Sequence, residues 1–323
     1  MSNLKRWLIT GGSGYIGSHI ADQFLASGQD VIVYDDMSHG LQSRIDFLRE
    51  KHQRDIPIVI SDIRDLESFA NVLDSHHPFG VIHAAGLKSV SKSMDSPDEY
   101  FDVNHLATKN LLECLSTAGV RNFIFSSTAA VYGSPSLTTP IDENYIPNPI
   151  SPYGASKLAA ENEVKAFISI PGNSGTCLRF FNVVGTAARE LMDHSTENLV
   201  PIVLNKLKSG EKPVVYGTDY PTPDGTCVRD YVDVRDVASA HLATAHSLSD
   251  LPAVMNVGTG RGVSVRDVIK LINHTQGGID AGVVESARRP GDSAILWAEV
   301  RLIEKHLGFK AKFSLKESLE SLI

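Results

Sequence analysis

Tyr153 and Lys157 stand four residues apart in Ser-Pro-Tyr-Gly-Ala-Ser-Lys, within a predicted helix over Pro152–Ile168. Residues four apart lie on one face of a helix, so the Lys157 ammonium can lie beneath the Tyr153 phenol. A free tyrosine has a pKa of about 10, and a nearby cation favours the phenolate. The positive charge of an oxidised nicotinamide would lower that pKa further. Such a phenolate can remove the hydroxyl proton of an alcohol while hydride leaves its carbon. The spacing alone is weak evidence, because a surface pair worth a few tenths of a kcal/mol gives the same pattern.

A glycine-rich loop near the N-terminus gives the pair its context. Gly11, Gly14 and Gly17 follow an apolar run and open a predicted helix over Ile16–Ser27. In this strand-loop-helix order the glycines allow a tight turn and a close approach of the backbone to a pyrophosphate, and the helix N-terminus offers free N–H groups. We therefore expect nucleotide binding by the loop and by Tyr15 and Ile16. A purely structural glycine turn is the alternative.

Acidic residues after the next two strands indicate which nucleotide is bound. Asp35 ends the second predicted strand, about twenty residues beyond the loop, where a carboxylate accepts hydrogen bonds from the ribose hydroxyls of adenosine. It would repel a 2′-phosphate, and the nearest arginine, Arg44, lies well past the strand end. These residues favour NAD over NADP. Asp62, after the third strand, is a candidate contact to the adenine edge or a simple helix cap.

Short apolar runs alternate with helix-length segments over the first 180 residues. This alternation predicts an α/β fold, a Rossmann-type doubly wound parallel sheet. After Asn182 the chain is rich in Pro, Gly and Asp, which predicts a smaller, loop-rich α/β substrate domain. We expect a division into residues 1–180, rejoined by about 233–250, and 181–323. The predicted strands are Arg6–Thr10, Val31–Tyr34, Ile58–Ile60, Val81–His83, Phe123–Ser126 and Thr176–Arg179, and the other predicted helices are Asp65–Asp74, Tyr100–Ala118 and Asp233–His246.

Composition excludes several classes of function. The 323 residues are 42% hydrophobic and carry a net charge of −8, without the dense Lys/Arg stripe of a nucleic-acid-binding surface. The N-terminus runs directly into the glycine loop, and no apolar run approaches the ~20 residues that span a bilayer. We therefore expect a cytoplasmic protein with neither a nucleic-acid nor a membrane partner. The three cysteines and twelve histidines lack metal-ligand spacing, so no metal site is expected.

Eight motifs, in order over nearly the whole chain, resemble the extended short-chain dehydrogenase/reductases and, within them, the UDP-glucose (UDP-galactose) 4-epimerase branch. The glycine loop and the Tyr/Lys segment mark the superfamily, whereas Gly-Leu-Lys and Asp-Gly-Thr-Cys-Val-Arg-Asp-Tyr point to the epimerases. The motifs occupy residues 11–19, 62–64, 85–88, 125–133, 151–157, 179–182, 224–231 and 288–292.

The resemblance implies a role for each matching residue. Tyr153 would be the acid/base, Lys157 would hold the nicotinamide ribose, and Thr128 would hydrogen-bond the reacting C4 oxygen of the sugar. Further cofactor contacts are implied at Ile63, Ala84, Ala85, Gly86, Lys88, Asn104 and Phe181, and further substrate contacts at Lys88, Asn182, Asn198, Leu199, Tyr216, Arg229, Arg289 and Asp292. Two arginines suit a diphosphate, because each guanidinium offers a planar fork of donors. Surface ion pairs, packing or capping are the alternatives for these residues.

The implied reaction interconverts UDP-galactose and UDP-glucose with tightly bound NAD, by oxidation at C4 and return of hydride to the opposite face. Three rivals stay open: a UDP-N-acetylglucosamine 4-epimerase, a dehydratase or decarboxylase of the same fold, and a non-enzymatic NAD-sensing regulator. Thr128 is followed by Ala129-Ala130, where dehydratases carry Asp-Glu and decarboxylases a glutamate. The regulator would be expected to lack the Tyr/Lys pair. The resemblance also implies that side-chain size at Leu296 decides whether an N-acetyl group fits beside the hexose, and leucine is of intermediate size, so both kinds of substrate stay open.

The resemblance also implies a homodimer, in which two helices, Tyr100–Ala118 and Pro152–Ile168, pair with the same helices of a second copy. Four positions depart from the commonest pattern, and none of them removes a reacting group: Phe180, Pro290, His105 and Ala107.

Overall fold

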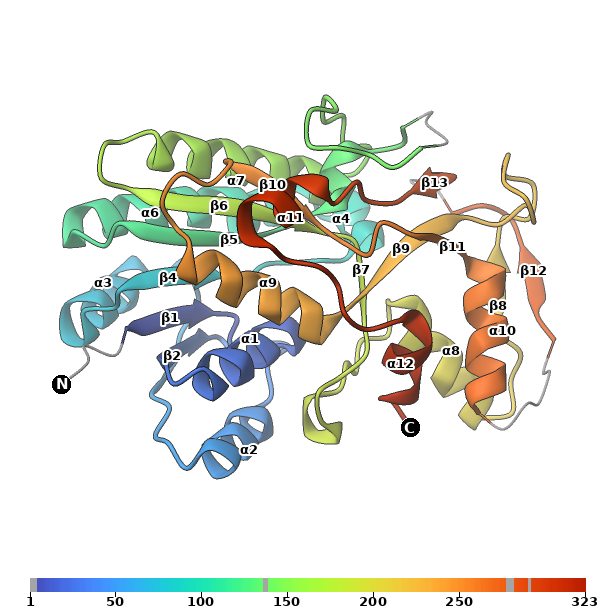
Figure 1. Cartoon of the computed structure of the whole chain (residues 1–323), viewed down its shortest axis with the longest axis horizontal. Coiled ribbons are helices and arrows are strands. Elements are labelled where there is room, and N and C mark those ends of the chain that lie inside the picture. Colours follow the sequence, from blue (N-terminus) through green and yellow to red (C-terminus); the bar gives the residue numbers. More distant parts are fainter. Residues whose placement is uncertain (1–4, 136–138, 277–281, 290–291) are drawn as a thin grey trace.

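A computed structural model describes residues 5–135, 139–276, 282–289 and 292–323. At its centre lies a seven-stranded sheet in the order β10-β6-β5-β4-β1-β2-β3, with every neighbouring pair parallel (Figure 1). The strands are β1 Arg6–Thr10, β2 Asp30–Asp35, β3 Ile58–Ile60, β4 Gly80–His83, β5 Asn122–Thr128, β6 Ser174–Phe180 and β10 Val254–Val257. The order reverses between β1 and β4, and in open parallel sheets ligands bind beyond the carboxyl ends of the strands at such a point.

Six of these strands confirm the predicted ones, with ends that extend by up to two residues. The seventh, β10, was not predicted, although it pairs with β6 from Val254↔Cys177 to Val257↔Phe180. It comes from the part of the chain assigned to the substrate domain, so the first sheet recruits residues beyond the predicted rejoining segment. The Rossmann-type fold class is confirmed, while the division into domains stays a prediction.

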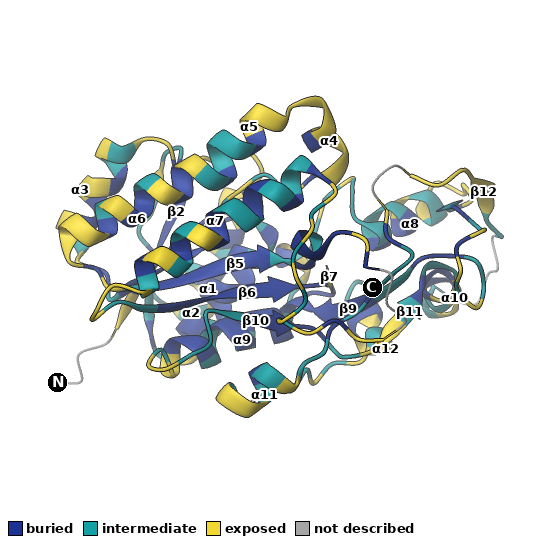
Figure 2. Ribbon diagram, turned by 90° about the horizontal axis from the view of Figure 1, so that it is seen from above, coloured by how far each residue is buried: buried dark blue, intermediate teal, exposed yellow. Residues whose placement is uncertain are grey.

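Helices cover both faces of the sheet, and Figure 2 shows its central strands buried between them. One face is covered by α1 Tyr15–Ala26, α2 Gln42–His52 and α9 Val234–His246, and the other by α3 Leu66–His76, α6 Ala107–Ala118 and α7 Pro152–Ile168. The helix predicted over Tyr100–Ala118 is divided into α5 Pro97–Phe101, a π-helical turn Asp102–Leu106 and α6. Short helices α4 Val90–Asp95 and α11 Arg301–Leu307 complete this part.

Within the described residues, the second part of the structure contains six short strands and two helices. Its main sheet is β11-β9-β13 with β7 also on β9, and β8 pairs with β12 separately. The strands are β7 Asn182–Val184, β8 Val214–Tyr216, β9 Val228–Asp233, β11 Gly262–Ser264, β12 Val284–Ser286 and β13 Ile295–Leu296, and the helices are α8 Leu199–Lys208 and α10 Val265–Thr275. Their apolar side chains form a core of their own around Val203, Tyr231 and Ile269.

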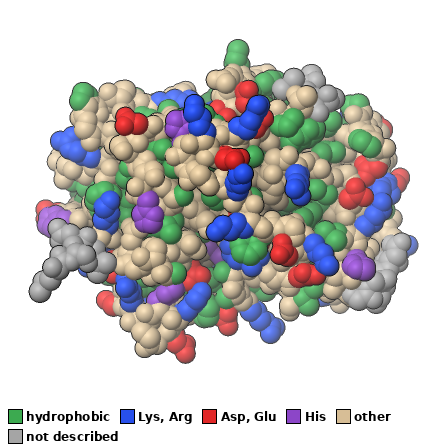
Figure 3. Space-filling model, viewed as in Figure 1, with side chains coloured by type: hydrophobic (Ala, Val, Ile, Leu, Met, Phe, Trp, Pro, Cys, Tyr) green, Lys and Arg blue, Asp and Glu red, His purple; other side chains and the backbone are tan. Residues whose placement is uncertain are grey.

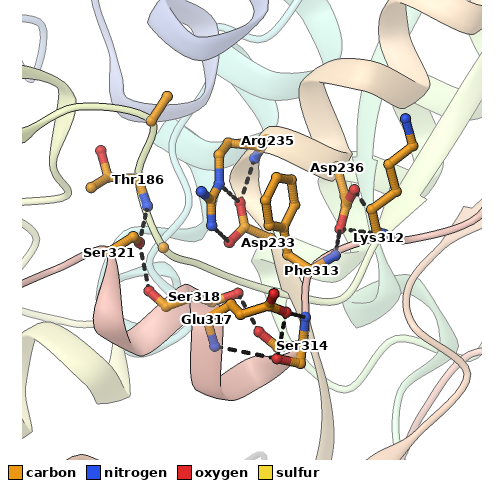
Figure 4. Close-up of polar contacts among 12 residues, drawn as sticks. Thr186, Asp233, Arg235, Asp236, Lys312, Phe313, Ser314, Glu317, Ser318 and Ser321 are labelled. Atoms are coloured by element: carbon orange, nitrogen blue, oxygen red, sulfur yellow. Dashed lines mark hydrogen bonds and ion pairs between the residues drawn. The ribbon is translucent and has the colours of Figure 1, made fainter. Parts of the chain in front are cut away.

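The C-terminal segment ties the two parts together (Figure 4). The Asp236 carboxylate on α9 accepts hydrogen bonds from the backbone N–H groups of Lys312 and Phe313, at 3.0 to 3.1 Å. The Arg235 guanidinium lies 3.6 Å from the centre of the Phe313 ring. Beyond the last helix, α12 Leu315–Glu320, the Ser321 hydroxyl accepts a hydrogen bond from Thr186 N–H. The chain end therefore fixes α9, which packs on the first sheet, against the loop after β7.

On the face seen in Figure 3, acidic and basic side chains are interspersed. Among the described residues, no helix is long and apolar enough to cross a membrane.

Candidate active site

The glycine loop lies between β1 and α1, at the reversal of strand order. Gly11 has a positive φ of 67°, and its N–H donates to Tyr34 O at 2.8 Å. A Cβ on Gly17 would lie 2.1 Å from Gly11 O, which only glycine avoids. The first residue before α1, Gly14, provides no side-chain cap. The N–H groups of Tyr15 and Ile16 therefore point out of an uncapped helix end, which fits the pyrophosphate of a dinucleotide.

The Tyr15 side chain has a structural task. Its hydroxyl donates to Gly185 O at 2.6 Å, and burial raises its pKa well above the usual value. Only the backbone of Tyr15 is thus free for a cofactor, while its ring anchors α1 to the loop after β7.

Asp35 and Asp62 end up at neighbouring strand ends, because β2 and β3 pair. The buried Asp35 carboxylate accepts hydrogen bonds from Ser13 N–H at 3.0 Å and Met37 N–H at 2.9 Å. Both oxygens of Asp62 are engaged by Arg64, whose hydrogen bonds lower the pKa of this carboxyl. Ile63 is buried in the core. The adenosine contacts assigned to these residues stay predictions.

The loop after β4, which carries Ala84, Ala85, Gly86 and Lys88, is held in place by Asn104. The Asn104 amide accepts from Leu87 N–H at 2.8 Å and donates to Leu87 O at 3.0 Å and to Ser156 Oγ on α7 at 3.1 Å. Asn104 lies in the π-helical turn, a feature that often marks functional sites. It shapes the loop beside α7, with most of its bonding capacity used. Lys88 Nζ is half-exposed and lies 4.0 Å from Asp193 Oδ1.

Tyr153 meets Thr128 where α7 passes the end of β5. A hydrogen bond from the Thr128 side chain favours the phenolate, but burial of the phenol is the larger effect and raises the pKa of Tyr153. The Thr128 hydroxyl also accepts from Ala130 N–H at 3.1 Å. The Tyr100 ring packs edge-on against the Tyr153 ring, with 6.3 Å between their centres. The two residues predicted to contact the reacting oxygen are thus brought together.

The Lys157 ammonium lies 4.0 Å from the centre of the Phe125 ring. The residue is 6% exposed, and burial lowers its pKa to about 8. Within the described parts of the chain, Nζ makes neither a hydrogen bond nor an ion pair. A buried donor of this kind fits the hydroxyls of a bound ribose, because it otherwise lacks a partner.

The predicted substrate residues fall into two groups. Asn182 is exposed at the start of β7, and Asn198 and Leu199 open α8, where Asn198 Nδ2 donates to Asp193 Oδ2 at 2.6 Å. In the other group, Arg229 Nη2 lies 3.5 Å from Asp292 Oδ1, and the Arg289 guanidinium stacks 3.8 Å from the centre of the Tyr216 ring. Phe181 is buried beside Leu296. Pro290 lies outside the described residues.

Sequence reasoning missed a buried ion pair next to Tyr153 and Lys157 on α7. Glu161 on α7 contacts Arg179 on β6 and Ser127 on β5. Asp193, which contacts both Lys88 and Asn198, was missed too. Glu161 follows Lys157 by four residues, a spacing that signals a shared helix face. Asp193 lies in an irregular loop, where no sequence pattern indicates a contact.

The fold is that of a Rossmann-type α/β protein, with a glycine loop after β1 and a Tyr/Lys pair on α7 as a candidate acid/base. Residues 7–258 match the NAD dependent epimerase/dehydratase family, and the chain belongs to that family. This match confirms the predicted resemblance.

Individual relatives are similar over almost their whole length. The UDP-glucose 4-epimerase of Yersinia enterocolitica is 38% identical, with 97% of this chain and 95% of the relative covered. The UDP-glucose 4-epimerase of Bifidobacterium longum, solved in complex with NAD+ and UDP, is 33% identical with a TM-score of 0.90, covering 98% and 96% of the chains. The UDP-Glc/GlcNAc 4-epimerase of Campylobacter jejuni is also 33% identical, with a TM-score of 0.85 and 98% of both chains covered.

Proposed function

We propose that this chain is an NAD-dependent UDP-glucose 4-epimerase, which interconverts UDP-galactose and UDP-glucose. The observation that carries the proposal is that Tyr153 meets Thr128 at the end of β5, at the same carboxyl edge of the parallel sheet as the uncapped glycine loop after β1, in a chain with full-length similarity to UDP-glucose 4-epimerases. If the residues have the same roles as in the family, NAD is bound by Lys157, the glycine loop and the loop after β4. Asn182, Asn198, Arg229 and Arg289 would hold the uridine diphosphate, with Tyr216 and Asp292 at the nucleoside.

When bound, NAD supplies a reversible hydride acceptor at C4 of the hexose. The chain supplies proton transfer: the Tyr153 phenolate takes the C4 hydroxyl proton, and the Thr128 hydroxyl orients the same oxygen. After the 4-keto sugar has rotated, its ketone is reduced from the opposite face, and Tyr153 returns the proton to the C4 oxygen. The arginines keep the diphosphate in place meanwhile, so the intermediate ketone can present its other face without leaving.

The short 3₁₀ turn after Thr128 separates epimerisation from the rival reactions. Its first residues, Ala129 and Ala130, carry no acid, whereas elimination of water needs an additional acid and base. The turn therefore favours simple epimerisation over a dehydratase or decarboxylase. Leu296, buried beside Phe181 and Ala129, would leave less room for an N-acetyl group than a smaller side chain would.

The proposal is tested by incubating the purified protein with UDP-galactose, and separately with UDP-N-acetylgalactosamine, without added cofactor. Proton NMR should show the gluco epimer of the first substrate as the single product, and slower conversion of the second. Equal or faster conversion of the second would favour the UDP-N-acetylglucosamine 4-epimerase. Absence of conversion, even with NAD supplied, would contradict the proposal and favour the NAD-sensing regulator.

We further propose a cytoplasmic homodimer that serves galactose metabolism, with a dinucleotide domain of residues 1–180 and a substrate domain of 181–323. The small side chains of Ala155, Ala159 and Ala166 lie along the outer side of α7, and Leu106, in the π-helical turn that packs on α7, is 47% exposed. Sedimentation should find particles of twice the chain mass. Ala159→Arg should dissociate them, whereas Asn71→Arg on the exposed side of α3 should not. A wild-type monomer at micromolar concentration would contradict the dimer.

A further inference from the structure

Behind Tyr153 and Lys157, α7 carries a glutamate that the proposed reaction does not itself use. Glu161 is 0% exposed, and its partner Arg179 is 1% exposed. Arg179 Nε donates to Glu161 Oε1 at 2.8 Å and Nη2 to Oε2 at 2.5 Å. Ser127 Oγ donates to Oε1 at 2.6 Å, and Lys165 Nζ lies 3.7 Å from Oε2. The carboxylate is thus held by β5, β6 and the next turn of α7.

Burying an ion pair is costly, and apolar side chains of similar volume are often at least as stabilising. The location of this pair suggests a reason for retaining it. Tyr153, Lys157, Glu161 and Lys165 follow one another at intervals of four residues, so they lie along one face of α7. Whenever Tyr153 is a phenolate, negative and positive side chains alternate along this face of the helix. Ser127, the residue before Thr128, fixes the glutamate to the strand end that carries the other reacting hydroxyl.

Lys157 needs such support because only Cys177 and Glu161 among the described residues favour its charge, and burial raises the pKa of the Cys177 thiol well above its usual value, which keeps that thiol neutral. From β5 it faces the uncharged Phe125 ring, from β6 the buried thiol of Cys177, and from β4 the ring of His83, whose pKa burial lowers to about 3. On α7 its neighbours are Tyr153 and Glu161. Burial lowers the pKa of Lys157 to about 8, and Cys177 and then Glu161 oppose that effect.

We propose that Glu161, oriented by Arg179 and Ser127, is a positioning residue that keeps Lys157 protonated for the reaction of Tyr153. The inference rests on the proposed function for the role of that pair, but the charge state of Lys157 can be measured without turnover. Glu161 lies about one helical turn from Lys157 on α7, and a nearby opposite charge favours the charged lysine. The Glu161→Gln variant also leaves the Arg179 cation unpaired.

The first experiment is an NMR titration of the protein grown with lysine labelled at its ε carbon. The Lys157 signal is the one that Lys157→Met lacks. We expect the pKa of Lys157 to fall by about one unit or more in Glu161→Gln. In Glu163→Gln, which removes a partly exposed acid from the same helix, we expect no change. An unchanged pKa of Lys157 in Glu161→Gln would overturn the proposal.

The second experiment separates electrostatic support from simple folding. The reaction requires charged Lys157, so kcat should decrease at high pH as this lysine loses its proton. In Glu161→Gln this alkaline decrease in kcat should occur at lower pH, by about the same shift as the pKa of Lys157. The double variant Glu161→Gln/Arg179→Gln has no buried charge at this place and should recover part of the lost Tm, yet keep the alkaline decrease at lower pH. A structural role alone predicts equal losses at every pH and full recovery in the double variant, which would refute the inference. If the wild type converts no nucleotide sugar, the proposed function is wrong. The NMR titration still tests the effect of Glu161 on the pKa of Lys157, because it does not depend on turnover.

Discussion

Gly17→Ala tests whether the close contact of the glycine loop with α1 positions the cofactor. The added Cβ would lie 2.1 Å from Gly11 O and 2.8 Å from both Gly11 C and Gly12 Cα. All three are backbone atoms of the loop, so no side-chain rotation relieves the clash. An ordinary contact requires the helix and loop to separate by about 1 Å or more. The N–H groups at the start of α1 would then move by a similar distance relative to the loop.

The cost to NAD binding follows from this displacement. A hydrogen bond of about 2.9 Å that lengthens by 1 Å is lost, and a bond to a charged group contributes about 1.5–3 kcal/mol. Loss of two such bonds to the pyrophosphate weakens binding by about 3–6 kcal/mol, or about 10²- to 10⁴-fold in Kd. The stability of the folded protein should change less than NAD binding, because alanine stabilises the interior of a helix by about 0.5–1 kcal/mol relative to glycine.

The assay is calorimetric titration of NAD into protein stripped of nucleotide, with the nucleotide that copurifies as a second readout. Gly14→Ala is the matched control, since its Cβ would lie 3.1 Å from the same Gly11 O, where a small shift suffices. Its Kd should stay within about tenfold of the wild type. Thermal melting of the stripped proteins checks that each is folded. A Kd for Gly17→Ala within threefold of that for Gly14→Ala would refute the reasoning.

Three further predictions concern the reacting groups, the substrate and pH. Tyr153→Phe should abolish the conversion of UDP-galactose, measured by NMR, and leave the amount of bound NAD unchanged, measured from the nucleotide released on denaturation. Near-normal turnover would show that another group is the base. Arg229→Met should raise KM for UDP-galactose by about 10- to 100-fold, through loss of a charged contact worth about 1.5–3 kcal/mol, while the Kd of NAD stays constant; an unchanged KM would remove Arg229 from the substrate site. Burial lowers the pKa of His241 from 6.5 to about 4, so the unfolded chain binds this proton first and stability falls as pH drops from about 6.5 to about 4. In His241→Gln, the slope of the free energy of unfolding in urea against pH should decrease by about 1.4 kcal/mol per pH unit over that range. A slope equal to that of the wild type would contradict a buried, neutral His241.

The sequence by itself determined those features whose causes lie within a few residues. The bounds of α7 were predicted correctly, because Ser151 accepts a hydrogen bond from Gly154 N–H at 3.1 Å and Pro152 occupies the first turn. The Rossmann-type fold followed from alternating apolar runs, and the glycine loop from its position between a strand and a helix. These are local signals, readable from spacing and residue type.

Only the tertiary structure decided which distant segments meet. Strand β10 joins the first sheet through pairing with β6, about 80 residues away, and no local pattern distinguishes it from a strand of the second part. The position of Nζ of Lys157 against Phe125, and the lowered pKa of that lysine, arise from burial among β4, β5 and β6. Glu161 meets Arg179 and Ser127 for the same reason. Pairing, burial and electrostatic fields depend on groups far apart in the chain. The sequence therefore indicates the candidate reacting residues, whereas the tertiary structure determines their surroundings and the direction in which their pKa values shift.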